Sequence, residues 1–131
     1  MSDQRPASAQ VIAWAAIPEE EVLPGITRQV YHGQEQTVVR YVYNTGSVFP
    51  MHAHPQEQMT AVLRGRMTFT VDDPRGGPPR QIELGPGEIA MLPANLPHGA
   101  EVVGPEDVET LNTLSPRRPD APIFDARERR P

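Results

Sequence analysis

The 131-residue sequence contains no cysteine and no lysine, and these two absences exclude several kinds of chemistry. Without cysteine there is no disulfide, no thiolate zinc site and no cysteine nucleophile. Without lysine, a Schiff-base mechanism and the lysine of a phosphate-binding loop are excluded, because every basic residue is arginine. Only four serines occur, and none lies in a Gly-x-Ser-x-Gly context, which argues against a serine hydrolase.

Aromatic side chains and positive charge are also scarce. Aromatic residues make up 5% of the chain, and the formal net charge is −5. Few stacking surfaces and a negative charge argue against nucleic acid as the main partner. No apolar run is long enough to cross a membrane. The first residues, MSDQRPASAQ, lack the basic start and apolar core of a secretion signal, so we expect a cytoplasmic protein.

The length predicts a single domain, and the hydrophobic pattern predicts an all-β fold. Short segments rich in β-branched and aromatic residues are separated by Gly and Pro turns, and no helical period of useful length occurs. An antiparallel sandwich or barrel follows. We expect strands at residues 11–17, 36–44, 80–84, 88–92 and 98–103, another at 108–114, and an antiparallel hairpin that turns at Gly65.

Strand alternation assigns some side chains to one face. In residues 108–114 it places Asn112 on the same face as three other alternate residues, and we expect this face to be the inner one. In residues 36–44, Arg40 lies on the face opposite Tyr41, and the pattern does not decide which face is internal. Arg40 is therefore only a candidate contact for a carboxylate.

Three of the four histidines fall in two short segments. The first reads GSVFPMHAHPQEQMTAVLRG and contains His52, His54 and Gln58, and the second reads GEIAMLPANLPH and ends at His98. If residues 48–54 are extended, His52 and His54 project from one face. Gln58 can return an amide oxygen to the same point, and His98 can close the set from another strand.

This donor set predicts a metal site. Three neutral imidazoles and one amide oxygen suit divalent zinc, iron, nickel, copper or manganese better than calcium or magnesium, and composition does not choose among them. Glu57 alternates to the opposite face from Gln58, so we interpret it as a solvated or supporting residue. His32 lies outside both segments and is interpreted as a turn residue.

The spacing of the two segments resembles the two motifs of the cupin superfamily, over about residues 25–118. The first motif is matched by Gly46, His52, His54, Gln58 and Gly65, with glutamine where glutamate is usual, and the second by Gly87, Pro93 and His98. The resemblance implies a double-stranded β-helix, or jelly roll, with a metal in its mouth. It also implies a homodimer formed through sheet edges. Residues 1–24 would be an arm with an edge strand, and residues 119–131 a charged, proline-rich tail.

Within the cupins, the chain is similar to the KdgF-type pectin-degradation proteins, which convert unsaturated uronate monosaccharides into their linear keto form. The likeness is carried by HAHPQEQ, LPANLPHGA and LNTLSPRRPD. It implies Arg118 as the contact for a substrate carboxylate and, as metal ligands, His52, His54, Gln58 and His98. Two positions differ: Asn112 replaces the family's proposed catalytic aspartate, and Leu114 replaces a phenylalanine. Asparagine cannot act as a general base.

The main functional hypothesis is a metal-dependent enzyme that acts on a small oxygenated metabolite of the sugar-acid, keto or enol type. The metal would serve as a Lewis acid in isomerase, lyase or cyclase chemistry, with Asn112 and Arg118 as the other active-site residues. Two alternatives stay open. A metal-dependent dioxygenase would use the space that three histidines leave on iron or copper, and a non-catalytic cupin would only bind a small molecule.

Overall fold

The computed structural model describes residues 8–118, and in this part of the chain it contains ten β-strands and one short 3-10 helix. In chain order the elements are η1 (Trp14–Ala16), β1 (Glu20–Leu23), β2 (Ile26–His32), β3 (Thr37–Tyr43), β4 (Val48–His52), β5 (Glu57–Arg64), β6 (Met67–Val71), β7 (Arg80–Leu84), β8 (Ile89–Leu92), β9 (His98–Glu101) and β10 (Val108–Ser115).

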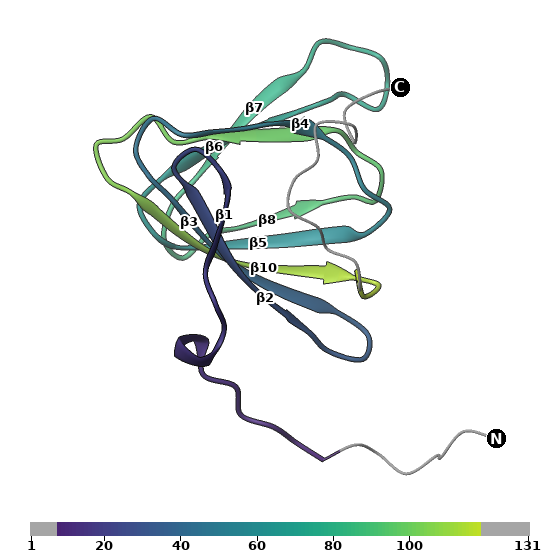
Figure 1. Ribbon diagram of the computed structural model, residues 1–131. Coiled ribbons are helices and arrows are strands. Elements are labelled where there is room, and N and C mark those ends of the chain that lie inside the picture. Colours follow the sequence, from purple (N-terminus) through teal and green to yellow (C-terminus); the bar gives the residue numbers. More distant parts are fainter. Residues whose placement is uncertain (1–7, 119–131) are drawn as a thin grey trace, which may run out of the picture.

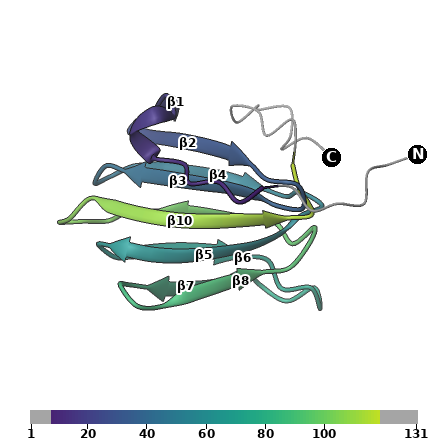
Figure 2. The ribbon, with the colours of Figure 1, turned by 90° about the horizontal axis from the view of Figure 1, so that it is seen from below.

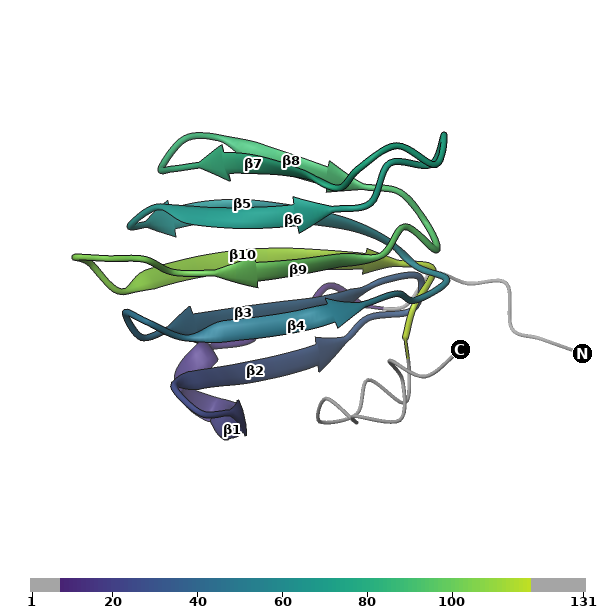
Figure 3. The same cartoon turned by 90° about the horizontal axis from the view of Figure 1, so that it is seen from above.

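The strands form two antiparallel sheets that face each other. The larger sheet has the order β1-β2-β3-β10-β5-β8, and the smaller has the order β4-β9-β6-β7. Figure 1 shows the sheets one above the other, and Figure 3 shows that the strands of both sheets lie along nearly the same axis. Figure 2 shows β10 in the middle of the larger sheet, between β3 and β5. This arrangement confirms the predicted all-β jelly roll.

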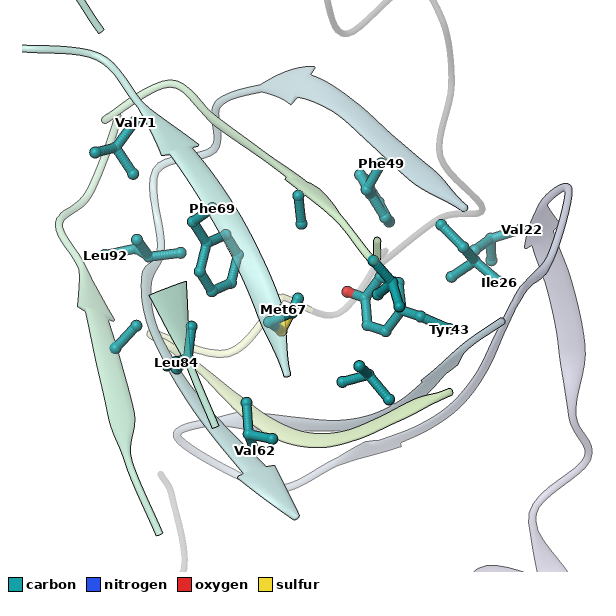
Figure 4. Packing of buried hydrophobic residues seen from close by; sticks show 14 residues of the cluster. Val22, Ile26, Tyr43, Phe49, Val62, Met67, Phe69, Val71, Leu84 and Leu92 are labelled. Atoms are coloured by element: carbon teal, nitrogen blue, oxygen red, sulfur yellow. The ribbon is translucent and has the colours of Figure 1, made fainter. Parts of the chain in front are cut away.

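Apolar side chains from both inner faces fill the space between the sheets. Met67, Phe69 and Val71 alternate along β6 and are buried, as their period of two predicts. Figure 4 shows Phe69 and Met67 in one cluster with Val62 from β5 of the facing sheet. Burial of each such side chain contributes about 1.5–3 kcal/mol. The core therefore holds the two sheets at a fixed separation, on which the geometry of any site between them depends.

The predicted hairpin around Gly65 is wrong, although both of its strands exist. β5 pairs with β10 and β8 in the larger sheet, while β6 pairs with β7 and β9 in the smaller one. Both edges of β5 are occupied, so β6 has to continue into the other sheet. Gly65 has φ +80 and lies so close to Asp107 that a Cβ would clash with the Asp107 carbonyl oxygen, which is why glycine is required at this corner.

The strand predicted at residues 11–17 is also wrong. The segment contains η1 instead, and no sheet partner lies beside it among residues 8–118. The side chain of Gln29 on β2 donates hydrogen bonds to the carbonyl oxygens of Trp14 and Ile17, at 2.7 and 2.9 Å. Side-chain donors thus satisfy backbone groups that a strand partner would otherwise have satisfied.

Four strands lie at sheet edges, namely β1 and β8 of the larger sheet and β4 and β7 of the smaller. The homodimer expected through such edges stays a prediction, and the predicted tail at residues 119–131 lies outside the described residues. Within residues 8–118, no helix has the length and apolar character needed to cross a membrane.

Candidate metal centre

Two of the three motif histidines lie opposite each other on neighbouring strands. β4 and β9 are antiparallel, and His52 on β4 is the direct cross-strand partner of His98 on β9. Their ring centroids lie 4.5 Å apart. Phe49 packs against the ring of His52 and Phe69 against that of His98, with centroid distances of 4.7 and 6.3 Å. Strand register and aromatic neighbours therefore bring the two imidazoles together at the inner face of the smaller sheet.

His54 reaches the same place from a loop, because β4 ends at His52 instead of extending through residue 54 as expected. Its ring centroid lies 5.6 Å from that of His52 and 5.2 Å from that of His98, and its side chain is buried. The carbonyl oxygen of His54 accepts a hydrogen bond of 2.8 Å from the backbone N–H of Asn95. The two histidine segments are thus tied together by backbone as well as by side chains.

Gln58 comes from the facing sheet, at the start of β5. Its Oε1 lies 3.1 Å from Nε2 of His54. The candidate ligand atoms of the three histidines all lie within 4.8 Å of one another. Ligands at about 2.1 Å from a common cation are separated by roughly 3 to 4 Å, so small side-chain rotations complete a site. The structure therefore brings together all four residues that the sequence indicated as ligands.

Backbone carbonyls determine which ring nitrogen of each histidine faces the centre. In each histidine, Nδ1 lies within hydrogen-bond distance of a backbone carbonyl oxygen. The pairs are His52 with Pro50 at 2.9 Å, His54 with Gln56 at 3.0 Å, and His98 with Leu96 at 2.9 Å. A carbonyl oxygen only accepts, so Nδ1 carries the proton and donates it. The lone pair then belongs to Nε2, which leaves this atom of each ring able to ligate a metal.

The donor set fits a cation for a further reason. Nε2 of His98 is buried and has no hydrogen-bond partner among the described residues. With the tautomers above, Nε2 of His54 and Oε1 of Gln58 are two acceptors only 3.1 Å apart. A buried unsatisfied polar atom costs about 1–3 kcal/mol, and two facing acceptors repel each other. A divalent cation between these atoms removes both penalties.

Burial also keeps the imidazoles neutral. It lowers the pKa of His52 to about 3, with the neighbouring His98 adding to the effect. It lowers the pKa of His98 to about 4, against the opposing influence of its bond to the Leu96 carbonyl. Both rings are therefore unprotonated at neutral pH and able to ligate a metal.

These lowered pKa values predict that the metal-free protein loses stability in acid. In the unfolded chain both histidines titrate near 6.5, whereas in the folded chain they stay neutral down to about pH 4. Below pH 6.5 the unfolded state binds more protons, so the free energy of unfolding should fall by about 1.4 kcal/mol per pH unit for each ring. Urea unfolding of chelator-treated protein between pH 7 and 5 measures this slope. A His98→Asn variant should show a shallower slope, and an unchanged slope in that variant would contradict the assignment.

A small cavity adjoins the histidines, with a free volume of about 40 Å³. Among the residues that line it are Asn112 on β10 and Arg118 just after β10, so both sequence-predicted active-site residues do lie beside the candidate ligands. Asn112 is buried, which confirms that it faces the interior. The full lining comprises Arg28, Val39, Tyr41, Phe49, His52, His54, Gln58, Asn112, Leu114 and Arg118.

Sequence reasoning missed Arg28 and Tyr41. Arg28 on β2 is buried, and its Nε donates to a carboxylate oxygen of Glu20 at 2.7 Å. It also forms a hydrogen bond to the hydroxyl of Tyr41. The one available signal was the strand period, because Arg28 alternates with the buried Ile26 and so faces inward.

Arg40, the candidate carboxylate contact, lies elsewhere, and that hypothesis is wrong. Its guanidinium donates to Glu109 at 2.6 Å and to Gln29 at 2.7 Å. Alternation along β3 puts Val39 and Tyr41 in the cavity lining, and it therefore turns Arg40 to the outer face of the sheet.

Comparison with known proteins places this arrangement in a family. The sequence matches the Cupin domain family over residues 39–114. No curated protein matches the chain. Among solved structures, KdgF from Halomonas sp. has a TM-score of 0.71 and 25% identity over 86% of this chain and 98% of that one. An RmlC-like cupin from Shewanella frigidimarina NCIMB 400 has a TM-score of 0.72 and 24% identity, over 86% and 96% of the two chains.

A larger protein shares the fold alone. Oxalate decarboxylase from Bacillus subtilis, in a structure described by its Mn(II) centres, has a TM-score of 0.80 and 16% identity. That similarity covers 95% of this chain but only 34% of the decarboxylase, so the present chain spans about a third of that protein. The family match, by contrast, extends over more than half of the 131 residues and includes both histidine segments. The chain therefore belongs to the cupin family, as a small single-domain cupin that resembles KdgF.

Proposed function

We propose that this cupin is a metal-dependent enzyme that isomerises or cleaves a small oxygenated molecule carrying a carboxylate. One observation carries the proposal. His52, His54 and Gln58 line a cavity that Arg28 and Arg118 also line, and His98 lies with the other two histidines in one group. The likeness to KdgF at 25% identity supports a substrate of the sugar-acid class.

The ligands would be Nε2 of each histidine and Oε1 of Gln58. A divalent transition metal held there would supply Lewis acidity, polarising a substrate carbonyl, hydroxyl or enolate. All four donors are neutral, so none of them would reduce the positive charge of the metal that acts on the substrate oxygen. The substrate oxygen would be the remaining donor at this centre.

The arginines would bind and orient the substrate anion. Arg28 is held by Glu20 and Tyr41, so its guanidinium has little freedom to move when a ligand arrives. A planar guanidinium matches a carboxylate with two parallel hydrogen bonds. Arg28 and Arg118 bring two guanidinium groups to the lining of the cavity, and this favours an anionic substrate.

Proton transfer would depend on Tyr41 instead of Asn112, because an amide side chain does not take up a proton at neutral pH. Burial raises the pKa of Tyr41, and the neighbouring Arg28 only partly opposes this effect. The phenol therefore stays protonated and can donate a proton from its hydroxyl. This chemistry favours the conversion of an enol to a ketone, in which the phenol would donate its proton to the enol carbon and take up the proton that the enol hydroxyl releases, over abstraction of a proton by a carboxylate.

The proposal is tested by loading chelator-treated protein with zinc, nickel, iron, copper or manganese and following a set of unsaturated uronates, sugar acids and keto acids by proton NMR. We expect conversion of a carboxylate-bearing compound, no conversion of its methyl ester, and no oxygen uptake. Oxygen consumption with iron or copper would replace the proposal with the dioxygenase hypothesis. A ligand that stays bound and is never converted would show instead that the protein is a non-catalytic small-molecule-binding cupin.

Replacing either cavity arginine should weaken substrate binding more than it slows turnover. Hydrogen bonds to charged groups contribute about 1.5–3 kcal/mol, so Arg28→Ala and Arg118→Ala should each raise KM roughly 10- to 100-fold. Arg117 is exposed and does not line the cavity, so Arg117→Ala provides a matched control. Steady-state kinetics of the three variants measure the effect. If KM changed by the same small factor in all three variants, neither Arg28 nor Arg118 would be a substrate contact.

A further inference from the structure

We infer that Asn112 and Thr60 act as positioning residues that fix the amide of Gln58, so that its oxygen faces the metal. The inference rests on the proposed function, since it takes Gln58 to be a ligand. A glutamine amide has two ends of similar size, and only the oxygen end can bind a cation. Any protein that uses glutamine as a ligand therefore has to prevent the amide from turning over.

A series of hydrogen bonds that begins at the Val39 backbone carbonyl prevents the Gln58 amide from turning over. The oxygen of Val39 only accepts hydrogen bonds, and Nδ2 of Asn112 donates to it at 3.2 Å. Nδ2 also donates to Oγ1 of Thr110, at 2.9 Å. With its nitrogen engaged on this side, Asn112 must present Oδ1 on the other side, toward Thr60 and Gln58.

The remaining contacts carry this orientation to the ligand atom. Oγ1 of Thr60 donates its proton to Oδ1 of Asn112 at 2.6 Å, and in return it accepts a bond of 2.9 Å from Nε2 of Gln58. Nε2 of Gln58 also lies 3.3 Å from Oδ1 of Asn112. Since both acceptors hold the nitrogen end, the oxygen end points the other way, to 3.1 Å from Nε2 of His54.

The network is shielded from solvent, so water does not replace a lost contact easily. Thr60, Thr110 and Asn112 are 1%, 0% and 2% exposed. If the Gln58 amide turned over, its oxygen would face the oxygen of Asn112, and both of its donated bonds would be lost. An aspartate at position 112 would have no N–H for the Val39 carbonyl. Asparagine at this position is therefore suited to anchoring a glutamine ligand, a role that needs no proton transfer.

Two buried threonines provide a matched test, because both contact Asn112 but only Thr60 also contacts Gln58. We expect Thr60→Val to weaken Co(II) binding about 10- to 100-fold, as changes to supporting hydrogen bonds do, and to shift the visible absorption bands of the bound ion. Thr110→Val removes one of the two acceptors of Asn112 Nδ2 and leaves the Val39 carbonyl in place, so it should weaken binding less than Thr60→Val does. Thr60→Ser, which keeps the hydroxyl, should restore both affinity and spectrum.

Repeating the Thr60→Val substitution in a Gln58→Glu variant tests whether its effect arises from the orientation of the Gln58 amide. In Gln58→Glu, either carboxylate oxygen can ligate, so adding Thr60→Val should change Co(II) affinity by no more than about twofold. The inference is overturned if Thr60→Val and Thr110→Val have equal effects, or if the loss persists in the glutamate background. Failure of the unsubstituted protein to bind Co(II) would overturn the proposed function itself. Normal Co(II) binding with no effect of Thr60→Val would overturn only this inference.

Discussion

Replacing His98 with alanine should weaken binding of a divalent transition metal by about a hundredfold or more, since loss of even a supporting contact costs 10- to 100-fold. The Nε2 atom of His98 is buried and has no hydrogen-bond partner among the described residues, so ligation is the role that explains its position. Its removal takes away one of the four candidate donors. Titration of chelator-treated protein with zinc measures the change in Kd.

His32 provides the control, as the fourth histidine of the chain. It lies at the end of β2, and its Nδ1 is 3.0 Å from Oγ1 of Thr37, away from the cavity lining. His32→Ala should leave the Kd for zinc unchanged within about twofold. Circular dichroism of both variants verifies that the sheets still form. Equal affinities in His98→Ala and the unsubstituted protein would mean that the histidine group is not a metal centre.

Replacing Gln58 with glutamate should tighten metal binding and slow the reaction. The carboxylate brings a negative charge to a centre whose donors are neutral, and in a buried site opposite charges attract strongly. We expect at least a tenfold lower Kd, which corresponds to about 1.4 kcal/mol. The same charge reduces the Lewis acidity felt by the substrate, so kcat should fall by about tenfold.

Glu57→Gln is the matched control for this change, because Glu57 neighbours Gln58 in sequence but is exposed and does not line the cavity. It alters the charge of the chain by one unit without altering a ligand, so neither Kd nor kcat should move by more than about twofold. Isothermal titration and steady-state kinetics measure the two quantities. If Gln58→Glu bound metal no more tightly than Glu57→Gln, Gln58 would not be a ligand.

The convergence of the four candidate ligands was predictable from the sequence because most of it is recorded in short-range spacing. His52, His54 and Gln58 fall within seven residues, and the concentration of three histidines in two segments added His98, which the cupin spacing then supported. The inner face of β10 was predictable for a similar reason, since alternation alone turns Asn112 inward. Local periodicity and motif spacing depend on residues that are close in the chain.

Features that depend on distant strands were not predictable in this way. A turn at Gly65 indicates that the chain reverses, but it does not indicate that β10 and β8 occupy both edges of β5. Arg28 joins the cavity because β2 pairs with β3, and its neighbours in sequence carry no motif. The contacts of Asn112 to Thr60 and Gln58 span 52 and 54 residues, so its hydrogen-bonding role follows only from the fold.

The proposed centre is tested most directly by a crystal structure of the metal-loaded protein, with anomalous scattering measured at the absorption edge of the added ion. We expect one anomalous peak, at about 2.0–2.3 Å from Nε2 of His52, His54 and His98 and from Oε1 of Gln58. A peak at another place, or none between the two sheets after saturation with metal, would contradict the metal centre and the function proposed from it.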